Sequence, residues 1–133
     1  MCGIVAIYNN QIKFDKDMRS KSLSMSKKVR HRGPDWSGIY ASDHAILAHE
    51  RLSIVDVKSG KQPIISNNDE IILAVNGEIY NHKLIRKDSK FNYDYKTESD
   101  CEVIIPLYDK IKNNLLNELS GIFAFFLYDK KNN

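Results

Sequence analysis

Short apolar segments separated by polar or glycine-containing turns are the feature that most constrains the fold of this chain. Five of them follow one another between residues 37 and 80, with the sequences SGIYAS, HAILAHE, RLSIVDV, QPIIS and EIILAVNGEIY. Runs of this length and composition are typical of β-strands. Because they follow one another so closely, we expect the strands to form antiparallel sheets.

Two further strands are predicted nearer the chain ends. Residues Gly3–Tyr8 form an apolar run bounded by the turn-like pair Asn9-Asn10, and residues Ile122–Tyr128 are more apolar still. The second strand is expected to need sheet neighbours on both sides, yet only DKKNN follows it. We therefore expect the sequence to be cut within its domain, although a polar tail is also a natural way for a chain to end.

Two helices are predicted before and between these strands. Residues 15–29 carry apolar side chains loosely at helical intervals, which indicates a surface helix. This helix should end before Gly33-Pro34, which forces a break. A short helix is expected over residues 81–87, followed by an exposed, charged loop over residues 86–96.

A third helix is predicted over residues 99–111, where the apolar side chains share one helical face. Ser99 and Glu102 form a capping-box pattern at its start. Pro106 removes one backbone hydrogen bond, so we expect a kink unless the helix starts later.

Length and charge exclude several classes of protein. The 133 residues make one domain, and the net charge of +3 is spread thinly, which argues against nucleic acid and membrane surfaces as partners. No apolar run approaches the ~18 residues of a membrane span, and no secretory signal is evident. The two cysteines are far apart and suggest no disulfide framework, so a cytoplasmic location is expected. The histidines show no paired ligand spacing with cysteine, so no metal site is predicted.

Cys2 stands immediately after the initiator methionine. Removal of Met1 would make it the amino terminus, with a thiol nucleophile and a free α-amine on one residue. The amine can serve as the base that activates the thiol. The alternative is that Cys2 is a small hydrophobic residue that starts a buried strand.

Six motifs occur in an order and at a spacing that resemble the glutaminase domain of glutamine-dependent asparagine synthetases. They are MCG, HRGPDWSG, AHERLSIVD, VNGEIYNH, TESDCEVI and LSGIFAFFLYD, and together they run from Cys2 to Asp129. The resemblance implies an α+β fold of the N-terminal nucleophile hydrolase type, a four-layer α/β/β/α sandwich of antiparallel sheets. It also implies that residues 1–133 are part of a class II glutamine amidotransferase domain, and that the synthetase domain is absent from this chain.

The resemblance assigns catalytic roles to three residues. Cys2 matches the nucleophile that attacks the glutamine carboxamide to form a thioester, and its freed α-amine would shuttle the proton. The Asn76 side chain and the Gly77 backbone N–H match the pair of oxyanion donors. Read without the resemblance, Asn76-Gly77 is a strong signal for a hairpin turn.

The resemblance also implies residues that hold free glutamine. Arg51 matches the arginine that binds the α-carboxylate, and Glu78 and Asp100 match positions at the ammonium end. Ile54 and Val55 look like pocket-wall and backbone-contact positions. The alternatives are a surface ion pair of Arg51 with Glu78, a first-turn helix role for Asp100, and core positions for Ile54 and Val55.

Six residues have simpler interpretations. His31 and Arg32 are expected to order the loop beside the site, and Trp36 to anchor a loop or an interface. His49 is expected to be structural, as is His82. Cys101 is expected to be a helix thiol near Asp100 and not a second nucleophile.

The implied function is hydrolysis of L-glutamine to glutamate and ammonia. In the full-length protein the ammonia would serve the ATP-dependent conversion of aspartate to asparagine. The glutaminase part would need no cofactor, whereas ATP and magnesium would belong to the missing synthetase domain. The expected partners of the glutaminase part are that synthetase domain and a second copy of the chain in a homodimer. The alternatives are a non-catalytic regulatory or glutamine-binding module of the same fold, or another class II amidotransferase. This chain on its own is expected to be poorly active or inactive.

Overall fold

The first sheet is built from three antiparallel strands near the start of the chain. The computed structural model describes residues 2–56 and 59–132. The strands β1, β2 and β3 lie in the spatial order β1-β3-β2, with Gly3 opposite Glu50 and Trp36 opposite Arg51. Their bounds are Gly3–Tyr8 for β1, Trp36–Ala41 for β2 and Ala45–Arg51 for β3. Trp36 therefore begins a strand, and Lys61 Nζ lies 4.6 Å from the centroid of its ring. Its role as an anchor of a loop or an interface stays a prediction.

The second sheet is also antiparallel and has the order β4-β5-β6. Strand β5 pairs with β6 along its whole length, from Ile71 opposite Asp129 to Ile79 opposite Gly121. Strand β4 contributes only two residues. The bounds are Ile64–Ile65 for β4, Ile71–Ile79 for β5 and Gly121–Asp129 for β6. The predicted antiparallel sheets are confirmed.

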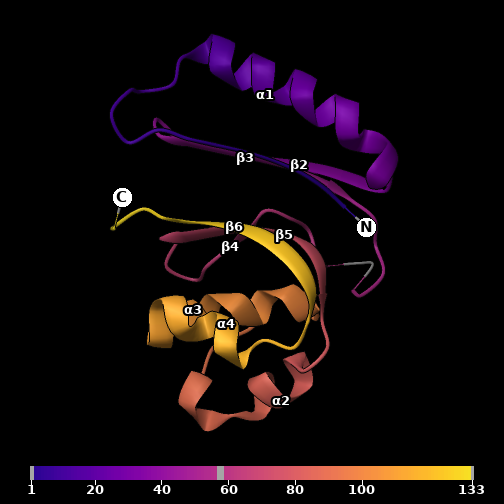
Figure 1. Cartoon of the computed structure of the whole chain (residues 1–133), viewed down its shortest axis with the longest axis vertical. Coiled ribbons are helices and arrows are strands. Elements are labelled where there is room, and N and C mark those ends of the chain that lie inside the picture. Colours follow the sequence, from indigo (N-terminus) through magenta and orange to yellow (C-terminus); the bar gives the residue numbers. More distant parts are fainter. Residues whose placement is uncertain (1, 57–58, 133) are drawn as a thin grey trace.

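The elements are stacked in layers (Figure 1). Helix α1 covers one face of the first sheet, the second sheet lies against the other face, and the remaining helices cover the far face of the second sheet. The bounds are Lys16–Val29 for α1, His82–Lys87 for α2, Ile104–Ile111 for α3 and Leu115–Glu118 for α4. The chain thus has a mixed α+β fold.

Two apolar clusters join these layers. The smaller lies between the sheets, where Leu47 of β3 packs with Ile72 and Tyr128 of the second sheet. The larger lies between the second sheet and its helices, and includes Leu73, Val75, Ile104 and Leu107. Burial of side chains of this size contributes about 1.5–3 kcal/mol each. The two clusters together fix the stacking order of the layers.

Helix α1 packs on the first sheet through small side chains. Asp15 caps it by accepting a hydrogen bond from the Met18 backbone N–H, which confirms the helix predicted for residues 15–29. Ser26 is buried and donates a hydrogen bond to the Glu50 carboxylate of β3 (2.6 Å), while Met25 is 47% exposed. The helix lies close to the sheet because its buried face carries serines, not large apolar residues.

The predicted helix over residues 99–111 is divided into two parts. A 3₁₀ turn covers Asp100–Val103, and α3 then begins at Ile104. Pro106 therefore lies in the first turn of α3, where a missing N–H costs no intrahelical bond. The later start explains why a proline is tolerated.

Ser99 accepts a hydrogen bond from the Cys101 N–H and so caps this segment. The other half of the predicted capping box is wrong. The Glu102 carboxylate accepts hydrogen bonds from the Lys96 and Thr97 backbone N–H groups. It folds the preceding loop onto the helix start.

Two other predictions need correction. The segment RLSIVDV is not a strand: β3 ends at Arg51, residues 52–56 are irregular, and Val57 lies outside the described residues. The loop over residues 86–96 is not simply exposed, because Phe91 is 8% exposed and joins the larger apolar cluster. Its aromatic residues give this charged segment an inward face.

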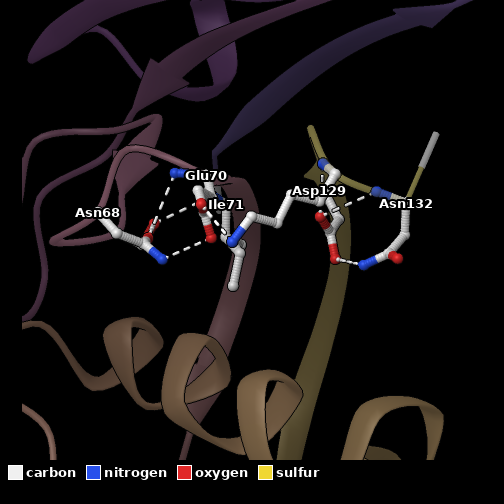
Figure 2. Close-up of polar contacts among 7 residues, drawn as sticks. Asn68, Glu70, Ile71, Asp129 and Asn132 are labelled. Atoms are coloured by element: carbon white, nitrogen blue, oxygen red, sulfur yellow. Dashed lines mark hydrogen bonds and ion pairs between the residues drawn. The ribbon is translucent and has the colours of Figure 1, made fainter.

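Polar contacts fix the end of the β5–β6 pair (Figure 2). Asn68 in the turn before β5 donates to the Glu70 carboxylate (2.7 Å). At the end of β6, Asp129 accepts from the Asn132 backbone N–H and side chain. These contacts all lie at the end of the ladder where Ile71 is opposite Asp129.

Within the described residues, no helix combines the length and apolar character needed to cross a membrane. Strand β6 has β5 as its neighbour among the described strands, and its residue Ile122 is 65% exposed.

The core assignment predicts the effect of one pair of matched substitutions. Leu107 is fully buried, so Leu107→Ala should lower the free energy of unfolding by about 2–5 kcal/mol. Leu116 is 55% exposed, so Leu116→Ala should change it by less than about 0.5 kcal/mol. Urea unfolding followed by circular dichroism measures both. Equal effects at the two positions would contradict the larger apolar cluster as the main core.

Candidate active site

A cleft lies where the start of β1 and the end of β3 in the first sheet meet one edge of β5. Its empty volume, which includes space open to solvent, is about 480 Å³. The first sheet and the loop after it contribute Cys2, Arg51, Leu52, Ile54 and Val55. The second sheet and the 3₁₀ turn contribute Val75, Gly77, Glu78, Asp100 and Cys101, while Gln62 and Ser99 complete the lining. Segments far apart in the sequence therefore form one site.

Cys2 is held at the cleft by two backbone contacts. Its sulfur accepts a hydrogen bond from the Leu52 N–H (3.4 Å) and lies 3.7 Å from the Leu52 carbonyl oxygen. Its own carbonyl accepts a hydrogen bond from Arg32 Nε (3.0 Å), as expected for a residue that orders this region. Cys2 is partly exposed and not a buried core residue. The thiol is thus accessible from the cleft.

The orientation of β5 determines which of its backbone groups face the cleft. In an antiparallel strand, the N–H and C=O of one residue point to the same neighbour and alternate along the chain. The even-numbered residues face β6, because Lys130 N–H donates to the Glu70 carbonyl and Tyr80 N–H to the Ser120 carbonyl. The odd-numbered residues face the opposite edge, where pairing with β4 stops at Leu73.

Side chains take the place of a neighbouring strand along part of this edge. The Val75 N–H donates to Gln62 Oε1 (2.6 Å), and the Ile79 N–H donates to Asp100 Oδ2 (2.7 Å). Gly77 lies between them, and its N–H has no partner among the described residues. The cleft therefore contains a free backbone donor on a rigid strand.

The pair Asn76-Gly77 lies inside β5, so the alternative prediction of a hairpin turn is wrong. Gly77 has φ +153°, and a Cβ built on it would lie 2.2 Å from the Ile122 carbonyl oxygen. Asn76 is not in the cleft lining, and its Oδ1 is buried without a partner among the described residues. Glycine is required here because any side chain would collide with β6.

Arg51 is 5% exposed and forms no ion pair with Glu78 in the described part of the chain, so the surface ion-pair alternative is wrong. Its Nη2 donates to the carbonyl oxygens of Val55 (3.0 Å) and Asp56 (2.5 Å). This explains the irregular backbone that follows β3, because the guanidinium binds two of its carbonyls. A guanidinium has five N–H donors, so this contact leaves others for a ligand.

Ile54 and Val55 are 59% and 36% exposed, so they are not core residues. They line the outer part of the cleft, and Glu78 lines it from the end of β5. Asp100 is 5% exposed and lies in the first turn of its helix. The structure thus brings together every predicted site residue except the Asn76 side chain.

Asp56 connects the two loops that border the cleft. Its Oδ2 accepts a hydrogen bond from the Glu98 N–H (2.9 Å), 42 residues away in sequence. Burial acts to raise the pKa of the Asp56 carboxyl, but hydrogen bonds from Ser59 and Glu98 outweigh it and hold the pKa below its ordinary value. Asp56 therefore stays ionised and keeps the loops joined.

His49 and Cys101 are buried beside the cleft. Burial lowers the pKa of His49, and its Nε2 lies 2.8 Å from the Val75 carbonyl, so a neutral ring donates through Nε2–H. Cys101 Sγ lies 3.7 Å from Asp100 Oδ1, and burial raises the pKa of its thiol, followed by the effect of Asp100. Both positions fit the structural roles predicted for them.

Five of the cleft residues are not among the predicted site residues: Leu52, Gln62, Val75, Ser99 and Cys101. Leu52 acts through its backbone, which leaves no signal in the sequence. The sequence predicts only a helix cap for Ser99 and only a strand position for Gln62. Gln62 precedes Pro63, and this pair indicates an irregular segment that can direct a side chain inward. In the described part of the chain, no group of three acidic, histidine or cysteine side chains could hold a metal ion.

Comparison with known proteins identifies the class to which this site belongs. The family model of the glutamine amidotransferase domain matches residues 1–133, and the chain belongs to that family. It is 53% identical to asparagine synthetase B (glutamine-hydrolyzing) of Escherichia coli over 98% of this chain. It is 48% identical to a probable asparagine synthetase (glutamine-hydrolyzing) of Dictyostelium discoideum and 45% to the asparagine synthetase of Brassica oleracea, each over 100% of the chain. The chain spans only 22–24% of the length of these relatives.

The difference in exposure between the two cysteines predicts their reactivity. Iodoacetamide at neutral pH should alkylate Cys2 at least about tenfold faster than Cys101, because Cys101 is 3% exposed and its pKa is raised by burial. Peptide mass mapping over time measures both rates. In urea the two rates should become similar. Equal rates in the folded protein would contradict the burial of Cys101.

Proposed function

We propose that this chain is the glutamine-hydrolysing part of an asparagine synthetase, with an N-terminal nucleophile hydrolase fold. One observation carries the proposal: the Cys2 thiol and the free Gly77 N–H line the same cleft from two different sheets. A nucleophile and an oxyanion donor are the two groups that amide hydrolysis needs first. The order of layers, helix, sheet, sheet, helices, is also the order of a four-layer α/β/β/α sandwich (Figure 1).

The proposed reaction begins with attack of the Cys2 sulfur on the side-chain carbonyl carbon of glutamine. The S–C bond forms, the C–N bond breaks, and ammonia leaves with a proton delivered by the α-amine. Water then hydrolyses the thioester to glutamate and restores the thiol. A free α-amine has an ordinary pKa of ~7.7–8.0, which suits this proton transfer. The mechanism requires removal of Met1, because an amide nitrogen cannot act as the base.

The Gly77 N–H is the proposed donor to the negative oxygen that develops in this reaction. It is held on β5, so it needs no rearrangement when charge appears. The Asn76 amide is proposed as the second donor, which requires its side chain to turn into the cleft, since it is not part of the lining in this structure. Its buried Oδ1 has no hydrogen-bond partner among the described residues. Rotation of the amide, which exchanges the positions of its oxygen and its NH₂ group, would therefore break no hydrogen bond of Oδ1.

The remaining site residues are proposed to hold the amino-acid end of glutamine. Arg51 would bind the α-carboxylate through guanidinium donors not used by the loop. The Asp100 and Glu78 carboxylates would attract the α-ammonium group. Asp100 is already oriented by the Ile79 N–H, so its charge stays on the cleft side of β5. Ile54 and Val55 would cover the substrate from the solvent side.

In the whole protein, the ammonia would be used to convert aspartate to asparagine in a synthetase domain that binds ATP and magnesium. Aspartate and ATP would both bind outside the residues described. The relatives that are named asparagine synthetases are about four times as long as this chain, which leaves room for such a domain.

Replacement of the nucleophile tests the proposal directly. In the natural protein that contains these residues, Cys2→Ala should abolish glutamine-dependent asparagine synthesis and leave synthesis from free ammonia unchanged. Ammonia release and asparagine formation are measured in parallel. Glutamine hydrolysis that survives the substitution would refute Cys2 as nucleophile. Loss of both activities would argue for a structural role of this residue.

Removal of the cationic anchor tests substrate recognition. Arg51→Ala should lower kcat/KM for glutamine by a factor corresponding to about 2–5 kcal/mol, because the substrate carboxylate loses its buried partner. Since Arg51 also holds the adjoining loop, a second comparison uses the unaltered protein. Glutamine and 4-aminobutanamide, which lacks the α-carboxylate, are compared as substrates. Equal turnover of the two amides would contradict recognition of a free amino acid.

A further inference from the structure

The N–H and C=O groups of Val75 point to the same edge of β5, where side chains and not a neighbouring strand bind them. The Val75 N–H donates to Gln62 Oε1 (2.6 Å), and the Val75 carbonyl accepts from His49 Nε2 (2.8 Å). All three residues are at least nine-tenths buried. Because β4 pairs with β5 only as far as Leu73, these groups would otherwise be buried without partners.

The two side chains connect the two sheets. His49 belongs to β3 and lies directly opposite Gly38 of β2 in the first sheet. A Cβ built on Gly38 would lie 1.9 Å from the Gln62 carbonyl oxygen, so the Gln62 backbone packs directly against this strand. Gln62 and His49 thus form a clamp that runs from the first sheet to Val75 in the second.

The clamp lies between the parts of the proposed active site. Cys2 precedes β1, which pairs with β3 in the first sheet, whereas Gly77 lies two residues beyond Val75 on the same edge of β5. The direction of the Gly77 N–H therefore depends on how the Val75 peptide is fixed. A displacement of about 1 Å between reacting groups can cost a hundredfold in rate.

We propose that Gln62 is a positioning residue for glutamine hydrolysis, which fixes the Val75 peptide and so directs the Gly77 N–H towards the developing oxyanion. This inference rests on the function proposed above. Since the oxyanion exists only in the transition state, loss of the clamp should lower kcat and leave the KM for glutamine nearly unchanged. A residue that contacted glutamine itself would mainly change KM.

Three substitutions test this role in the natural protein that contains these residues. Gln62→Met keeps the length of the side chain but removes the acceptor, and should lower kcat by about tenfold to a hundredfold with KM changed less than about twofold. Gln62→Glu keeps an acceptor for the Val75 N–H and should retain kcat within about threefold. Gln11→Met, at an exposed position outside the cleft, is the matched control and should change neither value.

Steady-state ammonia release gives kcat and KM, and circular dichroism confirms folding. If Gln62→Met does not fold, Gln62→Glu decides: retention of kcat supports the proposal, and a loss beyond tenfold overturns it. A kcat for Gln62→Met equal to that of the unaltered protein, or a rise in KM alone, also overturns the positioning role while the proposed function stands. An unaltered protein that releases no ammonia from glutamine overturns the proposed function and this inference with it.

Discussion

The incomplete pairing of β5 is the constraint on which the rest of the site depends. One edge of β5 is paired with β6 along nine residues, whereas β4 covers only two residues of the other edge. A buried strand edge must find other partners for its N–H and C=O groups. Gln62, His49 and Asp100 supply them at Val75 and Ile79. The Gly77 N–H between these positions has no partner among the described residues, and we propose it as the oxyanion donor.

The site also requires two sheets that meet face to face. The first sheet brings Cys2 and Arg51, and the second brings Gly77 and the contact to Asp100. Neither sheet alone carries both the proposed nucleophile and the free backbone donor. The apolar contacts of Leu47 with the second sheet therefore matter for the proposed chemistry as well as for stability, because they hold the two sheets on either side of the cleft together.

Much of the fold could be predicted from the sequence, because local patterns determine it. The strands Gly3–Tyr8 and Gly121–Asp129 and helix α1 follow directly from apolar runs and helical spacing. The segment after Arg51 has the composition of a strand, but its backbone is bent by a contact with the guanidinium of the residue before it. The roles at Cys2, Arg51 and Asp100 came from the order of whole motifs, since no single residue revealed them. The proposed positioning role of Gln62 depends on its hydrogen bond to Val75, 13 positions away, which no local pattern encodes.

The bond between Asp56 and the Glu98 backbone has a consequence for how this protein can vary during evolution. A bond from a side chain to a backbone N–H restricts the amino acid at one end only, because every residue except proline offers the same donor. This hydrogen bond therefore tolerates substitutions at position 98, except by proline, but not at position 56. The same asymmetry holds where Gln62 meets Val75 and where Asp100 meets Ile79. Selection on this cleft should therefore act mainly on the residues whose side chains accept these hydrogen bonds. The residues of β5 that donate them should be constrained mainly by their packing.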